Sequence, residues 1–241
     1  MNQQHTSQGN ILLYDQCVLT IPFLPSVAKV SLYYQFSVPN HILSHLHQLT
    51  EEQLCQVITV LRTSLTPINH KISHHINITN CKQVMIKIFT AYLTHSEEKN
   101  ALLLSRHEWL DHEQFIMSPY KKQILKTIAT IPYQTVASYQ DIARQAGYPG
   151  SARAVGQVCR HNPLPLLIPC HRVIRVSGFR DQDRLWQQSP DQIKQRLGSY
   201  QGGAHVKYLL LLSERLATHQ TTQPSLNSDS RDAKVAISCF N

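Results

Sequence analysis

The chain has 241 residues, of which 42% are hydrophobic and 16% charged, and its formal net charge at pH 7 is +8. This composition is typical of a globular protein, and no apolar run is long enough to cross a bilayer. The first residues carry neither the basic start nor the apolar stretch of a secretory signal, so we expect a cytoplasmic protein with no membrane partner. The six cysteines include no C-x-x-C pair, which argues against a zinc ribbon and a thioredoxin-like motif and favours free thiols.

The charge is unevenly distributed along the chain. Residues 117–217 carry 14 Lys and Arg against 5 Asp and Glu, whereas residues 1–116 carry 7 against 8. A basic domain attached to a neutral one favours a polyanionic partner, most often nucleic acid. A basic surface kept only for solubility is the alternative reading of the same charge.

The N-terminal half is predicted to mix strands and helices. Runs of β-forming residues bounded by prolines predict strands over residues 11–13, 18–21 and 27–34. The capping-box pattern from Thr50 to Gln53 predicts a helix that continues to about Leu61. A second helix is expected over residues 84–93.

The C-terminal half begins after a charged stretch without helical periodicity. Ser118-Pro119 has the pattern of a helix N-cap followed by proline, which predicts a helix to about Thr130. Beyond Ala217 the residues are mostly polar, which predicts a disordered tail. The domain organisation that we expect is an N-terminal domain over 1–110, a linker over 111–117, a second domain over 118–217 and a disordered tail over 218–241.

Two short helices separated by glycines are predicted between Ser138 and Asn162. Ser138 is placed to cap the first helix and Ser151 the second, with Gly147 and Gly150 in the turn, and this spacing is that of a helix-turn-helix. Arg153 falls in the first turn of the second helix, where recognition helices face DNA. Many such helix pairs only pack against other helices, and the basic charge of this half favours the DNA-binding interpretation.

A thiol and an imidazole stand side by side at Cys170 and His171. A thiol is a weak nucleophile until a base removes its proton, and histidine is a common base. Pro169 restricts the backbone next to the pair. Most cysteines are small buried hydrophobic residues, so the pair on its own leaves a purely structural reading open.

The motifs together resemble the O6-alkylguanine-DNA alkyltransferases, the methylated-DNA–protein-cysteine methyltransferase family. The resemblance covers about residues 118–215, and residues 1–110 carry no motif of the family. It rests on Ser118-Pro119-Tyr120, Ile131-Pro132, Arg153-Ala154-Val155-Gly156, Asn162-Pro163, Ile168-Pro169-Cys170-His171-Arg172-Val173-Ile174, Tyr200-Gln201-Gly202-Gly203 and the run from Lys207 to Glu214. The fold that it implies is α+β: a small ribonuclease-H-like sheet domain, then a mostly helical alkyltransferase domain with a winged-helix-like helix-turn-helix.

The resemblance implies a chemical role for each of five residues. Cys170 matches the acceptor, whose thiolate attacks the alkyl carbon on guanine O6 and keeps it as a thioether, so that each molecule reacts once. His171 matches the base, acting through a water, and Glu214 the carboxylate that orients it. Tyr139 matches the phenol that gives a proton to the departing base, and Asn162 the hinge residue that holds the recognition helix against the active-site turn. The expected substrate is O6-methylguanine and, less well, O4-methylthymine, with no cofactor.

The resemblance also implies the DNA interface. Arg153 matches the residue that enters the minor groove and fills the space left by a flipped nucleotide. The expected partner is double-stranded DNA containing O6-alkylguanine, bound by a monomer. Further DNA contacts are expected from Gln140, Ser151, Ala152 and Arg160, and the walls of the guanine pocket from Tyr139, Val173, Tyr200, Gln201 and Gly202.

The chain departs from the family pattern at three places. Gln134 stands where a glycine is usual, and we expect it to affect the approach to Ser138 and little else. An insertion over residues 179–197 contains a predicted helix opening at Ser189 and five large or basic side chains, namely Arg180, Arg184, Trp186, Lys194 and Arg196. It is interpreted as a source of DNA contacts or a partial lid, with a passive surface excursion as the alternative. Gln201 replaces a small residue and is expected to narrow the range of alkyl groups.

Three other functions compete with this reading. His41 with His45, and His70 with His74, have zinc-compatible spacing, but no cysteine or carboxylate converges on either pair, so no metal site is expected. A cysteine hydrolase would leave the helix pair unexplained. An alkyltransferase-like lesion sensor that binds without transferring is the remaining alternative; such proteins lack the acceptor cysteine, so this chain would need another defect, such as a pocket blocked by the insertion.

Overall fold

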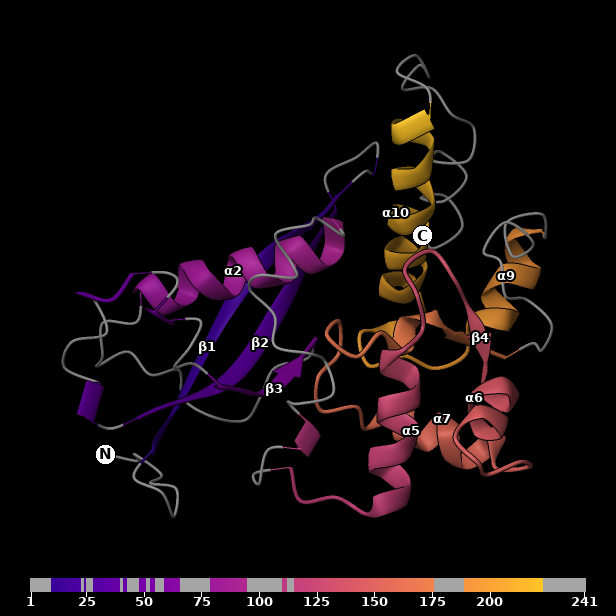
Figure 1. Cartoon of the computed structure of the whole chain (residues 1–241). Coiled ribbons are helices and arrows are strands. Elements are labelled where there is room, and N and C mark those ends of the chain that lie inside the picture. Colours follow the sequence, from indigo (N-terminus) through magenta and orange to yellow (C-terminus); the bar gives the residue numbers. More distant parts are fainter. Residues whose placement is uncertain are drawn as a thin grey trace. The chain divides into compact units, whose positions relative to one another are not determined.

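The computed structural model of the chain (Figure 1) is described here at residues 10–22, 24, 28–39, 41–42, 48–50, 53–54, 59–65, 79–94, 110–111, 115–175 and 189–222. The chain divides into two compact units. The first consists of Met1–Leu19, Val30–Ile116 and Pro163–Leu167, and the second of Thr20–Lys29, Met117–Asn162 and Ile168–Asn241. In these described ranges no helix is both long and apolar enough to cross a membrane.

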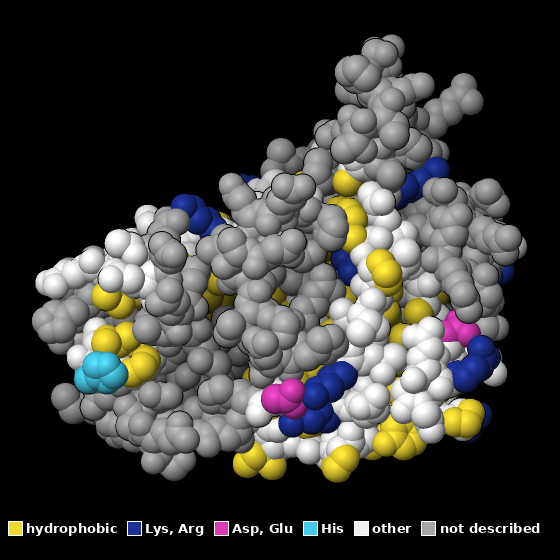
Figure 2. Space-filling view, in the orientation of Figure 1, with side chains coloured by type: hydrophobic (Ala, Val, Ile, Leu, Met, Phe, Trp, Pro, Cys, Tyr) yellow, Lys and Arg dark blue, Asp and Glu magenta, His cyan; other side chains and the backbone are white. Residues whose placement is uncertain are grey.

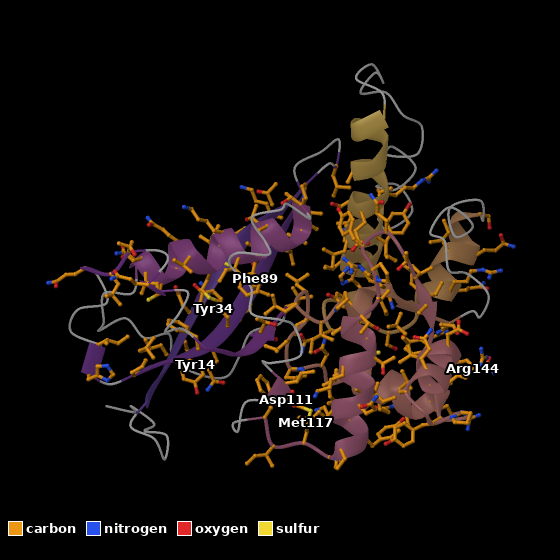
Figure 3. All side chains as sticks on the ribbon, viewed as in Figure 1. Tyr14, Tyr34, Phe89, Asp111, Met117 and Arg144 are labelled. Atoms are coloured by element: carbon orange, nitrogen blue, oxygen red, sulfur yellow. The ribbon has the colours of Figure 1, made fainter. Side chains whose placement is uncertain are left out.

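The first unit is built on a three-stranded sheet in the order β1-β2-β3. Its strands are β1 (Asn10–Ile21), β2 (Ala28–Pro39) and β3 (Thr59–Ser64), and its long helix is α2 (Thr79–Thr94). β2 and β3 are antiparallel, with Tyr33 opposite Ser64 and an irregularity between Gln35 and Phe36. Alternate residues of β2 are buried because side chains of a strand point to opposite faces. Tyr34 and Phe89 of α2 face one another with ring centres 6.2 Å apart (Figure 3).

Several of the predicted N-terminal elements are corrected by the structure. The two strands expected over 11–13 and 18–21 are one continuous strand, β1. The capping box at Thr50 forms, since Thr50 N donates to Gln53 Oε1 at 2.9 Å and Gln53 N donates to Thr50 Oγ1 at 3.3 Å. The helix does not reach Leu61, because Thr59–Ser64 is strand β3; its β-branched residues favour extended backbone, and pairing with β2 decides the outcome. Helix α2 starts at Thr79, five residues before the predicted start.

The second unit is mainly helical, and the α+β class that was expected for the chain is confirmed. Ser118 caps α5 with proline in its first turn, as predicted. The elements are α5 (Pro119–Ala129), β4 (Ala137–Ser138), α6 (Tyr139–Gln145), α7 (Ala152–Arg160), the 3-10 turn η2 (Cys170–Arg172), β5 (Val173–Ile174), α9 (Pro190–Leu197) and α10 (Gly203–Thr222). Helices α5, α6 and α7 pack on one another, and β4 runs parallel to β5. Helix α10 extends five residues into the segment that was expected to form the tail, and the remainder of that segment lies outside the described residues.

Candidate active site and nucleic-acid interface

Helices α6 and α7 form the predicted pair with glycines in the turn between them. Ser138 caps α6 as predicted, in a reciprocal box: its Oγ accepts from Asp141 N at 2.9 Å, and its own N donates to Asp141 Oδ2 at 3.3 Å. Gly147 and Gly150 have φ of 86° and 88°, a backbone conformation that favours glycine. Ser151 precedes α7, but its hydroxyl donates to Tyr148 O at 2.7 Å and makes no cap bond, so that part of the prediction is wrong.

The residues predicted to contact DNA are all at least partly exposed. On α7, Val155, Val158 and Cys159 are buried, whereas Arg153 and Arg160 reach solvent. Gln140 of α6 is exposed, and Ser151 and Ala152 are partly exposed at the start of α7. Figure 2 shows Lys and Arg side chains in dark blue on the face that it presents. This arrangement leaves both α7 arginines free to reach a phosphate backbone.

The thiol of Cys170 is buried and held by Asn162. Cys170 lies in the turn η2 with 1% of its surface exposed. Asn162 Nδ2 donates to Cys170 Sγ at 3.1 Å and to Ile168 O at 2.9 Å, and Cys170 N donates to the same carbonyl at 2.8 Å. The amide thus joins the residues after α7 to the turn that carries the thiol. The segment is a 3-10 turn, in which successive side chains diverge by about 120° at three residues per turn.

The surroundings of Cys170 favour the protonated thiol. Burial raises its pKa, while the hydrogen bond from Asn162 and the charge of Lys207 act in the opposite direction. Only the thiolate is a good nucleophile, so the sulfur needs a base before it can attack carbon.

His171 is oriented by Glu214. His171 Nε2 lies 2.8 Å from Glu214 Oε1, and both side chains are buried. Burial opposes ionisation of Glu214, but the Arg172 guanidinium and His171 outweigh it and lower the pKa to about 2. Because the carboxylate can only accept, Nε2 carries the hydrogen and Nδ1 of the neutral ring carries the lone pair. Burial also lowers the pKa of His171, which keeps the ring neutral.

Two buried polar atoms near this relay have no hydrogen-bond partner within the described part of the chain. They are His171 Nδ1 and the hydroxyl oxygen of Tyr200. The two rings meet edge to face, with centres 6.3 Å apart. His171 therefore keeps its basic nitrogen available, on a ring whose other nitrogen is occupied by Glu214.

Glu214 is also bound by Gln134 and Arg172. Arg172 Nε donates to Glu214 Oε1 at 2.9 Å, and its Nη1 donates to Ile131 O at 2.9 Å. Gln134 N donates to Glu214 Oε2 at 3.0 Å, and Gln134 Nε2 donates to Glu214 O at 2.9 Å. The expectation that Gln134 affects little besides the approach to Ser138 is wrong, because it contacts Glu214 through both its main chain and its side chain.

Tyr139 lies between two glycines. A Cβ at Gly156 of α7 would lie 3.9 Å from the ring of Tyr139, and a Cβ at Gly198 would lie 2.7 Å from its hydroxyl oxygen. Burial raises the pKa of Tyr139, so the phenol keeps its proton at neutral pH. Of the other expected pocket residues, Val173 and Tyr200 are buried, and Gln201 and Gly202 are partly exposed just before α10.

Lys207 is a functional candidate that sequence reasoning missed. Its side chain is fully buried, its Nζ donates to Val173 O, and it lies 5.9 Å from the centre of the Tyr139 ring. Burial lowers its pKa to about 8. Lysine is rarely buried, so the pattern gives little reason to place it inside. The signal that could have found it is its position before the apolar run from Tyr208 to Leu212.

The insertion contributes helix α9, whose end is connected to the end of strand β5. Ser189 caps α9, with Gln192 N donating to Ser189 Oγ at 3.4 Å and Ser189 N to Gln192 Oε1 at 3.0 Å, which confirms the predicted helix. Arg175 N donates to Arg196 O at 2.8 Å, so the end of α9 is tied to the end of β5. The segment with Arg180, Arg184 and Trp186, and the side chain of Lys194, lie outside the described residues.

The histidine pairs weighed as zinc ligands are only partly covered. His41 is described, whereas His45, His70 and His74 lie outside the described residues. Where the chain is described, no group of three or more His, Cys, Asp or Glu side chains is placed to hold a metal ion.

Comparison with known proteins matches the second half of the chain. Residues 119–216 match the family described as 6-O-methylguanine DNA methyltransferase, DNA binding domain, and this range contains every predicted site residue. A methylated-DNA–protein-cysteine methyltransferase of Mycolicibacterium paratuberculosis is 39% identical over 98 residues, which are 41% of this chain and 49% of that protein. The protein of the same name from Homo sapiens is 37% identical over 122 residues, or 50% of this chain and 49% of that protein. The chain thus spans about half the length of the curated relatives it matches.

Among solved structures, a variant of the Mycobacterium tuberculosis O6-methylguanine methyltransferase is similar over 85% of this chain and 93% of that chain. The TM-score is 0.46 and the sequence identity 22%.

Proposed function

We propose a function in direct-reversal DNA repair for this chain, whose residues 119–216 match the family described as 6-O-methylguanine DNA methyltransferase, DNA binding domain. The chain transfers the methyl group of O6-methylguanine, and less readily that of O4-methylthymine, to its own Cys170. The single observation that carries the proposal is the hydrogen bonding around this buried thiol. Asn162 binds the sulfur at 3.1 Å, and Glu214 orients the adjacent His171 at 2.8 Å.

The proposed step balances as a displacement at carbon. His171 Nδ1 takes the thiol proton through one bridging water, and the sulfur of Cys170 forms a bond to the methyl carbon. The bond from that carbon to O6 breaks, and its electron pair passes to the guanine ring, which receives a proton from the Tyr139 hydroxyl. A thioether does not hydrolyse, so each molecule acts once. The negative charge of Glu214 stabilises the imidazolium that His171 becomes.

The proposed partner is double-stranded DNA, bound by a monomer through α7. Arg153 enters the minor groove and fills the space of the flipped nucleotide, whose extrusion costs on the order of a few kcal/mol and least where pairing is already damaged. Phosphate contacts from Arg153 and Arg160 make binding weaken as salt rises. Arg153→Ala is expected to slow repair in duplex DNA far more than reaction with the free modified base, whereas an equal loss on both would remove the role in base extrusion.

The experiment that tests the proposal is intact-protein mass spectrometry after incubation with duplex DNA containing O6-methylguanine, followed by peptide mapping. One added methyl per chain, located on Cys170, is the expected result. Cys170→Ala should abolish the gain in mass and keep DNA binding, and the matched control Cys159→Ala, at a second buried thiol, should still gain one methyl. An unmodified protein that binds the lesion would overturn alkyl transfer and support the lesion-sensor function.

A further inference from the structure

Gln134 occupies a backbone conformation that ordinarily favours glycine. It follows α5 in the turn before β4, and its φ is 61°. A side chain other than glycine is disfavoured there, because Cβ crowds the following carbonyl. Such strain persists where surrounding contacts hold the residue in place, and it gathers at functional sites.

The contacts that hold Gln134 in this turn go to Glu214. The main-chain N–H of Gln134 donates to the carboxylate at Oε2, and the side-chain amide donates to the main-chain carbonyl of the same residue, at 3.0 Å and 2.9 Å. A glycine could supply the first of these bonds but not the second. The side chain of Gln134 therefore adds a fixed point between the turn and α10, at the residue of α10 that orients His171.

The same turn also contacts Arg172, which binds the carboxylate of Glu214. Arg172 binds Glu214 Oε1 and Ile131 O, and its guanidinium carbon lies 5.3 Å from the centre of the Tyr133 ring. Residues 131–134 thus contact both Glu214 and Arg172. Arg172 binds the same carboxylate oxygen of Glu214 as His171 does. A small displacement of α10 along its axis would lengthen the bond from His171 Nε2 to Oε1, which is 2.8 Å here.

We propose that Gln134 is a positioning residue, whose side-chain amide fixes α10 so that the carboxylate of Glu214 stays within hydrogen-bond distance of His171 Nε2. The inference rests on the proposed alkyl transfer for its kinetic test, but the geometry of the His171–Glu214 pair can be measured without any transfer. The role is specific to a side chain with an amide at the length of glutamine.

Gln134→Gly is the decisive variant, because glycine adopts the left-handed backbone and keeps the main-chain donor. Loss of one hydrogen bond should slow single-turnover methyl transfer at neutral pH by about three- to tenfold. The hydrogen bond that His171 donates to Glu214 raises the pKa of His171, so loosening it should move the acid limb of the pH–rate profile to lower pH. Gln134→Asn, with a shorter side chain that tolerates the same backbone, should behave like the glycine variant.

The control is Thr135→Ala in the same turn. Thr135 Oγ1 donates to Pro132 O at 2.9 Å, a bond within the turn that does not involve Glu214, so its loss should leave the acid limb unchanged. In a Glu214→Gln background, Gln134→Gly should have little further effect on the rate, because the two residues act through one another. An unshifted acid limb with a wild-type rate, or an undiminished effect in the Glu214→Gln background, would overturn the positioning role.

A readout independent of transfer separates this inference from the proposed function. The side-chain nitrogen NMR signals of His171 report its tautomer and its protonation as pH is varied. In the wild-type protein they should show hydrogen on Nε2, and in Gln134→Gly the titration should move to lower pH. Unchanged signals would overturn the role of Gln134 even if wild-type transfer is absent, and absent transfer with shifted signals would overturn the proposed function alone.

Discussion

His171 and Glu214 are joined through a single carboxylate oxygen, at 2.8 Å, although 43 residues separate them in the sequence. The same oxygen accepts from Arg172, and the other oxygen accepts from Gln134. With three donors, the carboxylate is ionised at any pH near neutrality, and its partner nitrogen is the protonated one. The tautomer of His171 is therefore determined by Glu214 and by the residues that bind its carboxylate, Arg172 and Gln134.

Glu214→Gln should slow methyl transfer by about 10²-fold or more, in the range of general-base contributions. The amide keeps the shape of the side chain but lacks the charge that stabilises a protonated His171. The rate should be measured in single turnovers with O6-methylguanine in duplex DNA. Asp141→Asn, at the cap of α6, removes a carboxylate outside the relay and should leave the rate near that of the wild type. Equal losses for both variants would contradict the specific role of Glu214.

The free energy of unfolding should fall as the pH is lowered from about 6.5 toward 2. The pKa of His171 is lowered by burial, so the unfolded chain binds a proton first, and stability is lost from the ordinary pKa downward. The pKa of Glu214, about 2 in the folded state, gives stability that is present above 4.5 and is lost as the pH approaches 2. Urea denaturation at a series of pH values measures this, and a flat profile below pH 6.5 would contradict the burial of the pair.

Asn162→Ala should raise the pKa of Cys170 further. The variant removes the side-chain hydrogen bond that opposes the effect of burial on the thiol. Thiolate absorbance in the ultraviolet, measured against pH and corrected with Cys170→Ala in the same background, gives the pKa. His161→Ala, the exposed neighbour, is the control. A thiol that titrates as in the wild-type protein would mean that Asn162 does not stabilise the thiolate.

Gly198→Ala should displace Tyr139 and reduce both stability and transfer. The new Cβ would stand 2.7 Å from the hydroxyl oxygen and 3.1 Å from a ring carbon, at a φ of 69°. Overpacking of this kind costs about 1–3 kcal/mol. Gly147→Ala is a matched control, because its φ is 86° but nothing lies within 4 Å of its Cβ. Thermal unfolding and transfer rates of the two variants separate the effect of backbone strain from that of the collision with Tyr139.

Thr63→Val should destabilise the first unit by about 1–3 kcal/mol, the cost of leaving a buried acceptor unpaired. Thr63 is buried, and its Oγ1 donates to Pro165 O at 2.9 Å, while its main-chain N donates to Pro163 O at 2.8 Å. Valine keeps the shape and the second bond. Thr94→Val, which loses an exposed bond from Thr94 Oγ1 to Thr90 O of its own helix, should change the unfolding free energy much less. A neutral Thr63→Val would contradict the importance of this contact.

Features encoded by neighbouring residues could be predicted from the sequence. The starts of α5, α6 and α9 follow from a capping serine and its partner three residues later, and the proximity of Cys170 to Asn162 followed from the family pattern. Sequence-based prediction was wrong or incomplete where contacts between residues far apart in the chain determine the structure. Strand β3 forms because β2 provides a partner, and Lys207 is buried because Val173 accepts its hydrogen bond. The contacts of Gln134 span 80 residues and leave no local trace.

The depth of Cys170 has a consequence for how long the protein remains usable. In the proposed reaction Cys170 is consumed, so an earlier reaction of its thiol with any soluble electrophile would inactivate the molecule. With 1% of its surface accessible and a pKa raised by burial, the resting sulfur is both shielded and weakly nucleophilic. Persistence and selectivity then have the same origin, because the buried thiol stays inert toward small reagents until a base, in the proposed reaction His171, removes its proton.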